Sequence, residues 1–338
     1  MNPVKEIKPL GFQWETADPF LFCVHHEDAF PKGNEVMAPT SSMQGRHMGD
    51  DFIIKDGFRM YHGKTVPGFP GHPHRGFETI TVVRKGVVDH ADSMGASGRY
   101  GDGDVQWMTA GKGVQHSEMF PLIHQEKDNP MELFQIWLNL PKVNKMVEPH
   151  FKMLWREAIK EHVHTDANGK KTSVEVIAGK LGKIVAPAPP PNSWAANEKN
   201  EVAVWNMKME PGATFTLPKA SAGINRTLYF YEGDVLQVAE KTVKLYHAIV
   251  VEAEVDLALK VGDKKASILV LQGKPIGEPV IQYGPFVMNT KEEINKAFDD
   301  YHQTQFGGWP WPKYDQVHAR NKGRFAKHSD GKLEEKVG

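Results

Sequence analysis

The chain has 338 residues, of which 40% are hydrophobic and 25% charged, so it holds enough apolar material for a sizeable core. At roughly 150 residues per domain, this length favours two domains. The 41 basic residues nearly balance the 42 acidic ones, which excludes a strongly charged protein and gives no reason to expect nucleic acid or an anionic membrane as a partner.

The amino-terminal residues and the cysteine count together indicate a protein of a reducing compartment. They lack the apolar stretch of about 7–15 residues that is typical of a signal peptide. No apolar run in the sequence approaches the roughly 20 residues that are needed to cross a bilayer. The single cysteine, Cys23, cannot form a disulfide within the chain. We therefore expect a cytoplasmic protein without a membrane-spanning segment.

Short β-branched runs, separated by many glycines and prolines, dominate the chain. They predict strands at 79–83, 134–138, 228–231 and 268–271. Helices are expected only over 153–161 and 291–301, the second with Thr290 as its N-cap and Glu293 three residues later. This pattern predicts an all-β protein with few short helices, built as sandwiches or antiparallel β-barrels.

A weak internal repeat suggests that the two domains are copies of one β-barrel unit. Residues 81–86 and 228–233 both have the pattern of a strand that ends in a charged residue followed by a glycine. The polar, proline-bounded segment 142–149 lies between them, so we predict domains at 1–145 and 146–338. The aromatic tail around Trp309 and Trp311 is too apolar to remain in solvent, and we expect it to pack back on the amino-terminal domain.

Two histidine-rich motifs carry the chemistry. Residues 71–78 read Gly-His-Pro-His-Arg-Gly-Phe-Glu, and residues 111–118 read Gly-Lys-Gly-Val-Gln-His-Ser-Glu. Side chains two residues apart on a strand share a face, so His72 pairs with His74, and His116 pairs with Glu118. If the two strands face one another inside a barrel, these four side chains converge and form a metal site.

The same alternation, continued along the first strand, makes a further prediction. It places Ile80 and Val82 on the face of the histidines, and Thr79 and Thr81 on the opposite face. Glu78 also fits a His-x-His-x₃-Glu spacing, which leaves it open as an alternative ligand or as a carboxylate that supports the ligands.

The expected donor set limits which metals can bind at this site. Three imidazoles and one carboxylate suit one divalent transition metal, which can be Fe(II), Mn, Co, Ni, Cu or Zn. They argue against Ca²⁺ and against a thiolate-bound cluster. Aligning Gly86 with Gly233 places Lys219, Ser221 and Asn225 where His72, His74 and Glu78 stand in the first domain. These three residues are poor metal ligands, so no metal is expected in the second domain.

The motifs closely resemble those of the pirin family. The resemblance rests on 71–83 and 102–121, and extends to 19–34, 145–152 and 284–294. It implies two tandem cupin-type barrels with one iron-type site in the first, whose ligands would fall on His72, His74, His116 and Glu118. The family's other motif glutamate would be Glu78.

The resemblance implies two functions of different classes. The first is a metal-dependent oxygenase similar to quercetin 2,3-dioxygenase, cleaving a small flavonol-like aromatic substrate with dioxygen, with Glu118 as ligand and base. The alternative is a metal-binding, redox-responsive regulatory protein that acts through protein partners. A cavity that opens at the metal would favour the enzyme, and a closed site would favour the regulator.

Overall fold

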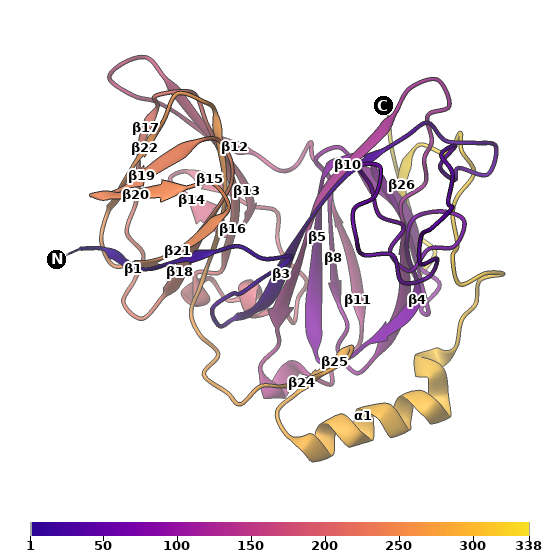
Figure 1. Cartoon of the computed structure of the whole chain (residues 1–338). Helices are drawn as coiled ribbons and strands as arrows, with labels where there is room; N and C mark the ends of the chain where they lie inside the picture. The colour runs from indigo at the N-terminus through magenta and orange to yellow at the C-terminus, as the bar shows by residue number, and fades with distance from the viewer. Residues whose placement is uncertain (1, 338) are drawn as a thin grey trace. The chain divides into compact units, whose positions relative to one another are not determined.

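The computed structural model of the chain describes residues 2–337, and β-strands make up most of it (Figure 1). Contacts divide the chain into two units. The first comprises Met1–Val24, Trp137–Pro141 and Leu154–Gly277, and the second comprises His25–Ile136, Lys142–Met153 and Glu278–Gly338. The predicted domain boundary between residues 145 and 146 stays a prediction. Among the residues described, no helix is long and apolar enough to cross a membrane.

The second unit is built on two six-stranded sheets. One has the order β27-β26-β7-β6-β9-β4. Its strands are β27 (Leu333–Lys336), β26 (Arg324–Lys327), β7 (Ser97–Gly101), β6 (Val87–Asp92), β9 (Val114–Met119) and β4 (Gly68–His74). The other has the order β11-β8-β5-β10-β3-β2; β2 belongs to the first unit, and β11, β10 and β3 contribute residues to both units. Its strands are β11 (His150–Leu154), β8 (Val105–Thr109), β5 (Phe77–Lys85), β10 (Asn129–Asn139), β3 (Phe20–Phe30) and β2 (Gln13–Trp14).

The first unit combines a seven-stranded sheet, ordered β1-β21-β18-β23-β16-β13-β12, with a four-stranded sheet, ordered β17-β22-β19-β20. The larger sheet contains β1 (Val4–Pro9), β21 (His247–Glu252), β18 (Asn225–Glu232), β23 (Ala266–Gly273), β16 (Ala203–Met209), β13 (Lys171–Ala178) and β12 (Glu161–Thr165). The smaller contains β17 (Thr214–Leu217), β22 (Leu257–Val261), β19 (Val235–Val238) and β20 (Lys241–Lys244). Apolar side chains of both sheets, such as Trp205, Phe215 and Ile268, form one core.

Short elements complete the chain. They are the strands β14 (Lys180–Leu181), β15 (Ile184–Val185), β24 (Ile281–Tyr283) and β25 (Phe286–Met288), and the 3-10 turns at Lys142–Asn144, Trp194–Ala196, Glu198–Asn200 and Gln305–Gly307. The all-β class with few short helices is confirmed. The described strands form separate sheets joined by side chains rather than continuously hydrogen-bonded barrels.

One α-helix, α1 (Lys291–Thr304), lies beside β25 in the second unit (Figure 1). The predicted cap is confirmed, because Thr290 and Glu293 form a reciprocal capping box. The helix predicted over 153–161 is wrong. Met153 and Leu154 are the buried end of β11, and a turn follows in which the Ala158 amide donates to the Trp155 carbonyl.

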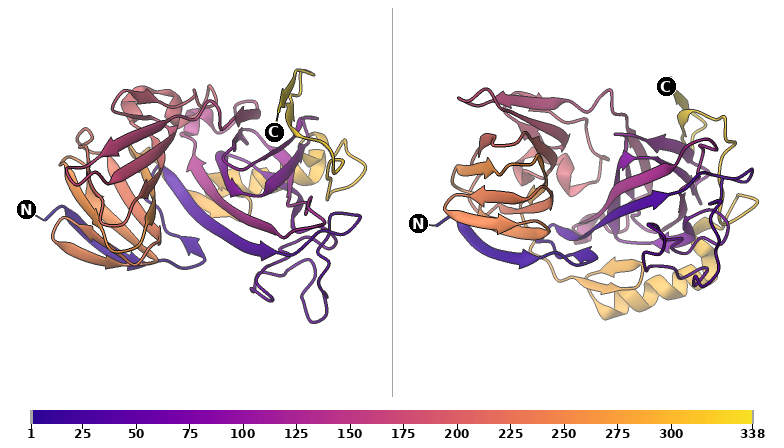
Figure 2. Two further views of the ribbon diagram at one scale, coloured as in Figure 1. Left: turned by 90° about the horizontal axis from the view of Figure 1, so that it is seen from above. Right: turned by 45° about the horizontal axis from the view of Figure 1, so that its top comes forward.

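The residues after α1 run along the sheet that contains β6 and β7, as the yellow segment in Figure 2 shows. β26 pairs antiparallel with β7, with Phe325 opposite Arg99. The Trp311 indole donates a hydrogen bond of 2.8 Å to the Asp92 carbonyl. Neither Trp309 nor Trp311 is fully exposed.

Candidate metal centre

The two histidine motifs lie on adjacent strands of one sheet. β4 and β9 pair antiparallel, with His72 directly opposite His116. The register shifts between Phe69 and His72, so a bulge precedes the first histidine. β4 is the edge strand of its sheet, which accommodates Pro73, a residue without a backbone donor. The pairing brings the two motifs onto one surface, as their spacing predicts.

Three imidazoles meet at this point. Their ring centroids lie 4.5 Å apart for His72 and His116, 4.7 Å for His72 and His74, and 4.9 Å for His74 and His116. One ring nitrogen from each lies within 4.8 Å of the other two. His74 and His116 are buried, whereas His72 is partly exposed. The cluster therefore reaches the surface at His72.

The surroundings keep these imidazoles neutral, which metal binding requires. Burial lowers the pKa of His72 to about 4, and holds the pKa of His74 and of His116 well below the ordinary value. The Pro70 carbonyl lies 2.9 Å from Nδ1 of His72. Because that nitrogen must donate to the carbonyl, Nε2 keeps its lone pair.

His116 supplies the clearest test of whether a metal fits. Its side chain is fully buried, and neither ring nitrogen has a hydrogen-bond partner among residues 2–337. A buried polar atom without a partner is costly, and a bound cation would satisfy one of these nitrogens. The residues present thus fit a divalent transition metal held by imidazoles.

Glu118 lies beside this cluster without belonging to its closest group. One of its carboxylate oxygens is 3.8 Å from Nε2 of His116. Thr81 Oγ1 lies 2.8 Å from the carboxylate, and the Gln135 amide donates to it at 3.2 Å. Burial raises the pKa of Glu118, and the bonds from Thr81 and Gln135 oppose that shift.

The predicted facing of residues 79–82 is wrong. At Gly76 the backbone enters the left-handed region with φ of 86°, which ends β4, and the chain restarts as β5 in the other sheet. The alternation is reset, so Thr81 faces Glu118. Glu78 falls on the opposite face of β5, where its carboxylate accepts a 2.6 Å bond from Thr109.

Sequence reasoning missed several neighbours of the centre. His90 on β6 lies opposite Glu118 in the pairing of β6 with β9, and its ring centroid is 5.5 Å from that of His116. Its Nε2 lies 3.1 Å from the Asp92 carboxylate. Thr81 and Gln135 could be found only from the alternation of β5 and β10 once the break at Gly76 is known.

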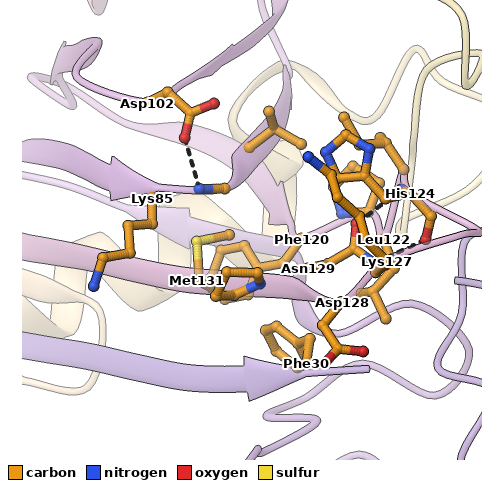
Figure 3. A pocket seen from close by; sticks show the side chains of 15 residues that line it. Phe30, Lys85, Asp102, Phe120, Leu122, His124, Lys127, Asp128, Asn129 and Met131 are labelled. Carbon is orange, nitrogen blue, oxygen red and sulfur yellow. Dashed lines mark hydrogen bonds between the residues drawn. The ribbon is translucent and has the colours of Figure 1, made fainter. Parts of the chain in front are cut away.

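A cavity of about 380 Å³ lies elsewhere in the second unit (Figure 3). Phe30, Phe120 and Met131 give it apolar walls, and Lys127 and Asp128 stand at its polar side. None of the three clustered histidines lines it, and neither does Glu118.

The fold and the histidine cluster define a two-domain cupin protein. Family models support this, since the pirin model matches residues 33–138 and the pirin C-terminal cupin domain matches residues 204–307. The chain is 38% identical to Pirin-1 of Arabidopsis thaliana over 248 residues, covering 71% of this chain and 78% of the relative. It is 34% identical to human Pirin over 263 residues, covering 76% and 83%. The chain belongs to the pirin family.

Solved structures agree with this assignment. The crystal structure of quercetin 2,3-dioxygenase from Acinetobacter baumannii is similar with a TM-score of 0.72 and 26% identity, covering 91% of this chain and 99% of that one. The resemblance to pirins and the two cupin-type units inferred from the sequence are confirmed.

Proposed function

We propose that this protein is a metal-dependent dioxygenase that cleaves flavonol-like aromatic substrates. The observation that carries the proposal is the cluster of His72, His74 and His116, whose ligand atoms lie within 4.8 Å of one another. The similarity of the chain to the Acinetobacter quercetin 2,3-dioxygenase supports the reaction class.

In this proposal the three histidines and Glu118 hold one metal per chain. Fe(II) suits three neutral imidazoles and one carboxylate, and Mn, Co, Ni, Cu and Zn fit the same donors. A bound redox-active metal supplies Lewis-acid chemistry toward the substrate and electron transfer with dioxygen. His72 orients its free nitrogen through its bond to Pro70, and the partial exposure of His72 leaves a side open to ligands.

Glu118 is the proposed proton acceptor for a substrate hydroxyl. A carboxylate can take that proton only from a position within hydrogen-bond reach of the substrate. Thr81 and Gln135 fix the Glu118 side chain beside His116, so its position does not depend on a flexible rotamer. The rings of Phe69 and His72 lie 6.3 Å apart, and both are partly exposed, so a planar substrate could approach across them.

A second candidate function is a metal-bearing, redox-responsive regulator that acts through a protein partner. One observation favours it: the cavity of about 380 Å³ does not open on the histidine cluster. In that case the metal would change the protein's affinity for its partner with oxidation state, and no small substrate would turn over.

Oxygen uptake decides between the two. The protein, stripped of metal and reloaded separately with Fe(II), Mn, Co, Ni, Cu and Zn, is mixed anaerobically with quercetin and then exposed to dioxygen. The dioxygenase proposal expects uptake in at least one redox-active form and far less in the Zn form, because Zn²⁺ has no redox chemistry. Uptake no greater than that of the Zn form in every case would favour the regulator.

A further inference from the structure

Residues 305–314, the C-terminal strap, cross the strands that carry the histidines. The strap begins where α1 ends, at four successive residues with positive φ from Gln305 to Gly308. These four residues reverse the direction of the chain, so the strap runs back toward β9 and β4. The matched family domain ends at residue 307, so most of the strap lies outside the part of the chain that the family models describe.

The strap covers the outer face of these strands. Side chains alternate along a strand, so the positions of Gly71 and Gln115 lie on the face opposite to that of His72 and His116. The buried Gln115 amide donates at 2.6 Å to the Gln305 carbonyl, at the start of the strap. Its oxygen accepts a 3.1 Å bond from the Tyr301 hydroxyl of α1. The residue next to His116 is thus bonded to the strap and to the helix before it.

Two glycines allow the strap to approach closely. A Cβ at Gly71 would stand 2.6 Å from a ring carbon of Tyr314, and one at Gly113 would stand 2.6 Å from the Phe306 ring. The Gly71 amide also donates at 2.8 Å to the Tyr314 carbonyl. Gly71 does not adopt a left-handed backbone, so its lack of a side chain is explained by this contact rather than by φ.

The strap is anchored at both ends. Near its start, the Arg75 guanidinium lies 4.6 Å from the centre of the Phe306 ring. Beyond its end, the buried Arg99 donates to the backbone carbonyls of the following segment, at His318, Ala319, Arg320 and Lys322. The same guanidinium binds both oxygens of Asp89 at 2.6 and 2.7 Å. Such a bidentate pair holds its partners in a defined geometry.

We propose that the C-terminal strap positions the metal ligands of β4 and β9, with Gly71 and Gln115 as positioning residues. An edge strand has a ladder partner on one side only, so β4 needs another contact to hold its histidines at ligand distance. The Tyr314 carbonyl supplies it at Gly71, one residue before His72. This inference rests on the proposed metal site but not on the proposed oxygenase reaction.

The test uses the full chain with Gly71→Ala and, separately, Gln115→Leu. The first pushes the Tyr314 ring away, and the second removes the bonds to Gln305 and Tyr301. Each variant is loaded with Co(II), and release to a chelator is followed by the cobalt absorption spectrum. Losing groups that orient metal ligands typically weakens metal affinity by about 10–100-fold, so we expect release at least about tenfold faster than in the unaltered protein.

Gly323→Ala is the matched control, since a Cβ there meets only an ordinary contact of 3.8 Å. Release as slow as in the unaltered protein from both test variants, or equally fast release from the control, would overturn the proposal. Hydrogen exchange of metal-free protein gives an independent measure. Amides of 68–74 and 114–119 should exchange faster in the test variants, and unchanged exchange would contradict positioning by the strap. A protein that holds metal but consumes no oxygen would refute the dioxygenase alone.

Discussion

Thr81 and Glu118 meet across the interior of the second unit, with Thr81 Oγ1 2.8 Å from the carboxylate, although their strands belong to different sheets. Glu118 sits two residues after His116 on β9, while Thr81 sits on β5. The contact therefore connects the sheet that carries the histidines to the sheet opposite it. The orientation of the carboxylate beside His116 depends on that second sheet.

Thr81→Val should disturb Glu118 while leaving the shape of the core nearly intact. Loss of the hydroxyl removes a bond to a buried carboxyl group, which costs on the order of 1–2 kcal/mol of unfolding free energy. Turnover should fall as well, because Glu118 loses one of the groups that orient it. Urea unfolding and oxygen uptake measure the two effects.

Thr79→Val is the control for this substitution. Thr79 is buried on the same face of β5, and its hydroxyl has no hydrogen-bond partner within residues 2–337. Its replacement should be neutral or slightly stabilising. An equal loss of stability in both variants would argue against a special role for the bond between Thr81 and Glu118.

His116→Ala should remove most of the bound metal. This imidazole is fully buried at the centre of the cluster, and neither of its ring nitrogens has a hydrogen-bond partner in the described part of the chain. Metal content by elemental analysis should fall from one ion per chain to a small fraction. His162→Ala, on β12 of the first unit, should leave the content unchanged. Full occupancy in His116→Ala would be incompatible with the assigned site.

Glu118→Gln should reduce turnover more than metal content. The amide keeps the size of the side chain, and its one oxygen can still accept a bond from Thr81 or from Gln135, but it cannot accept a substrate proton. We expect a fall in kcat of roughly 10²–10⁴-fold, the usual contribution of a general base, with most of the metal retained. Parallel loss of metal and turnover would instead make Glu118 a ligand without a role as base.

The metal-free protein should lose stability as the pH falls below about 6.5. Burial lowers the pKa of His72 to about 4, and keeps the pKa of His74 and His116 well below their ordinary value. Between the folded and unfolded pKa values the unfolded chain binds more protons, so acid favours unfolding. The slope should approach about 1.4 kcal/mol per pH unit for each histidine.

Urea unfolding at pH 7, 6 and 5 measures this dependence. His116→Gln removes one titrating group, so its free energy of unfolding should change less steeply with pH. A slope identical to that of the unaltered protein would show that His116 is not held neutral by the fold.

Local alternation predicted the pairing of His72 with His74 and of His116 with Glu118, because each pair lies within one uninterrupted strand. The prediction failed at Gly76, where a left-handed residue moved the chain into another sheet and brought Thr81 to the site. A glycine alone does not mark such a change of sheet, because the chain has 31 glycines. Gln135 and His90 reach the centre through strand pairings that span tens of residues, which spacing alone does not reveal.

The helix expected over 153–161 failed for a related reason. Its apolar residues are compatible with both a helix and a strand end, and the tertiary partner decides between them. Met153 and Leu154 are buried as part of β11, which pairs within the sheet. By contrast, Thr290 and Glu293 specify their helix start through bonds between near neighbours, so the sequence alone was sufficient there.

The most direct measurement of the central claim is the fate of labelled dioxygen. Fe(II)-loaded protein is supplied with quercetin and ¹⁸O₂, and the cleaved product is examined by mass spectrometry beside the product from Zn-loaded protein. The proposed dioxygenase predicts that both oxygen atoms of one ¹⁸O₂ molecule enter the products, with far less product from the Zn form. Product formation that is independent of the metal, or product oxygen that comes from water, would contradict it.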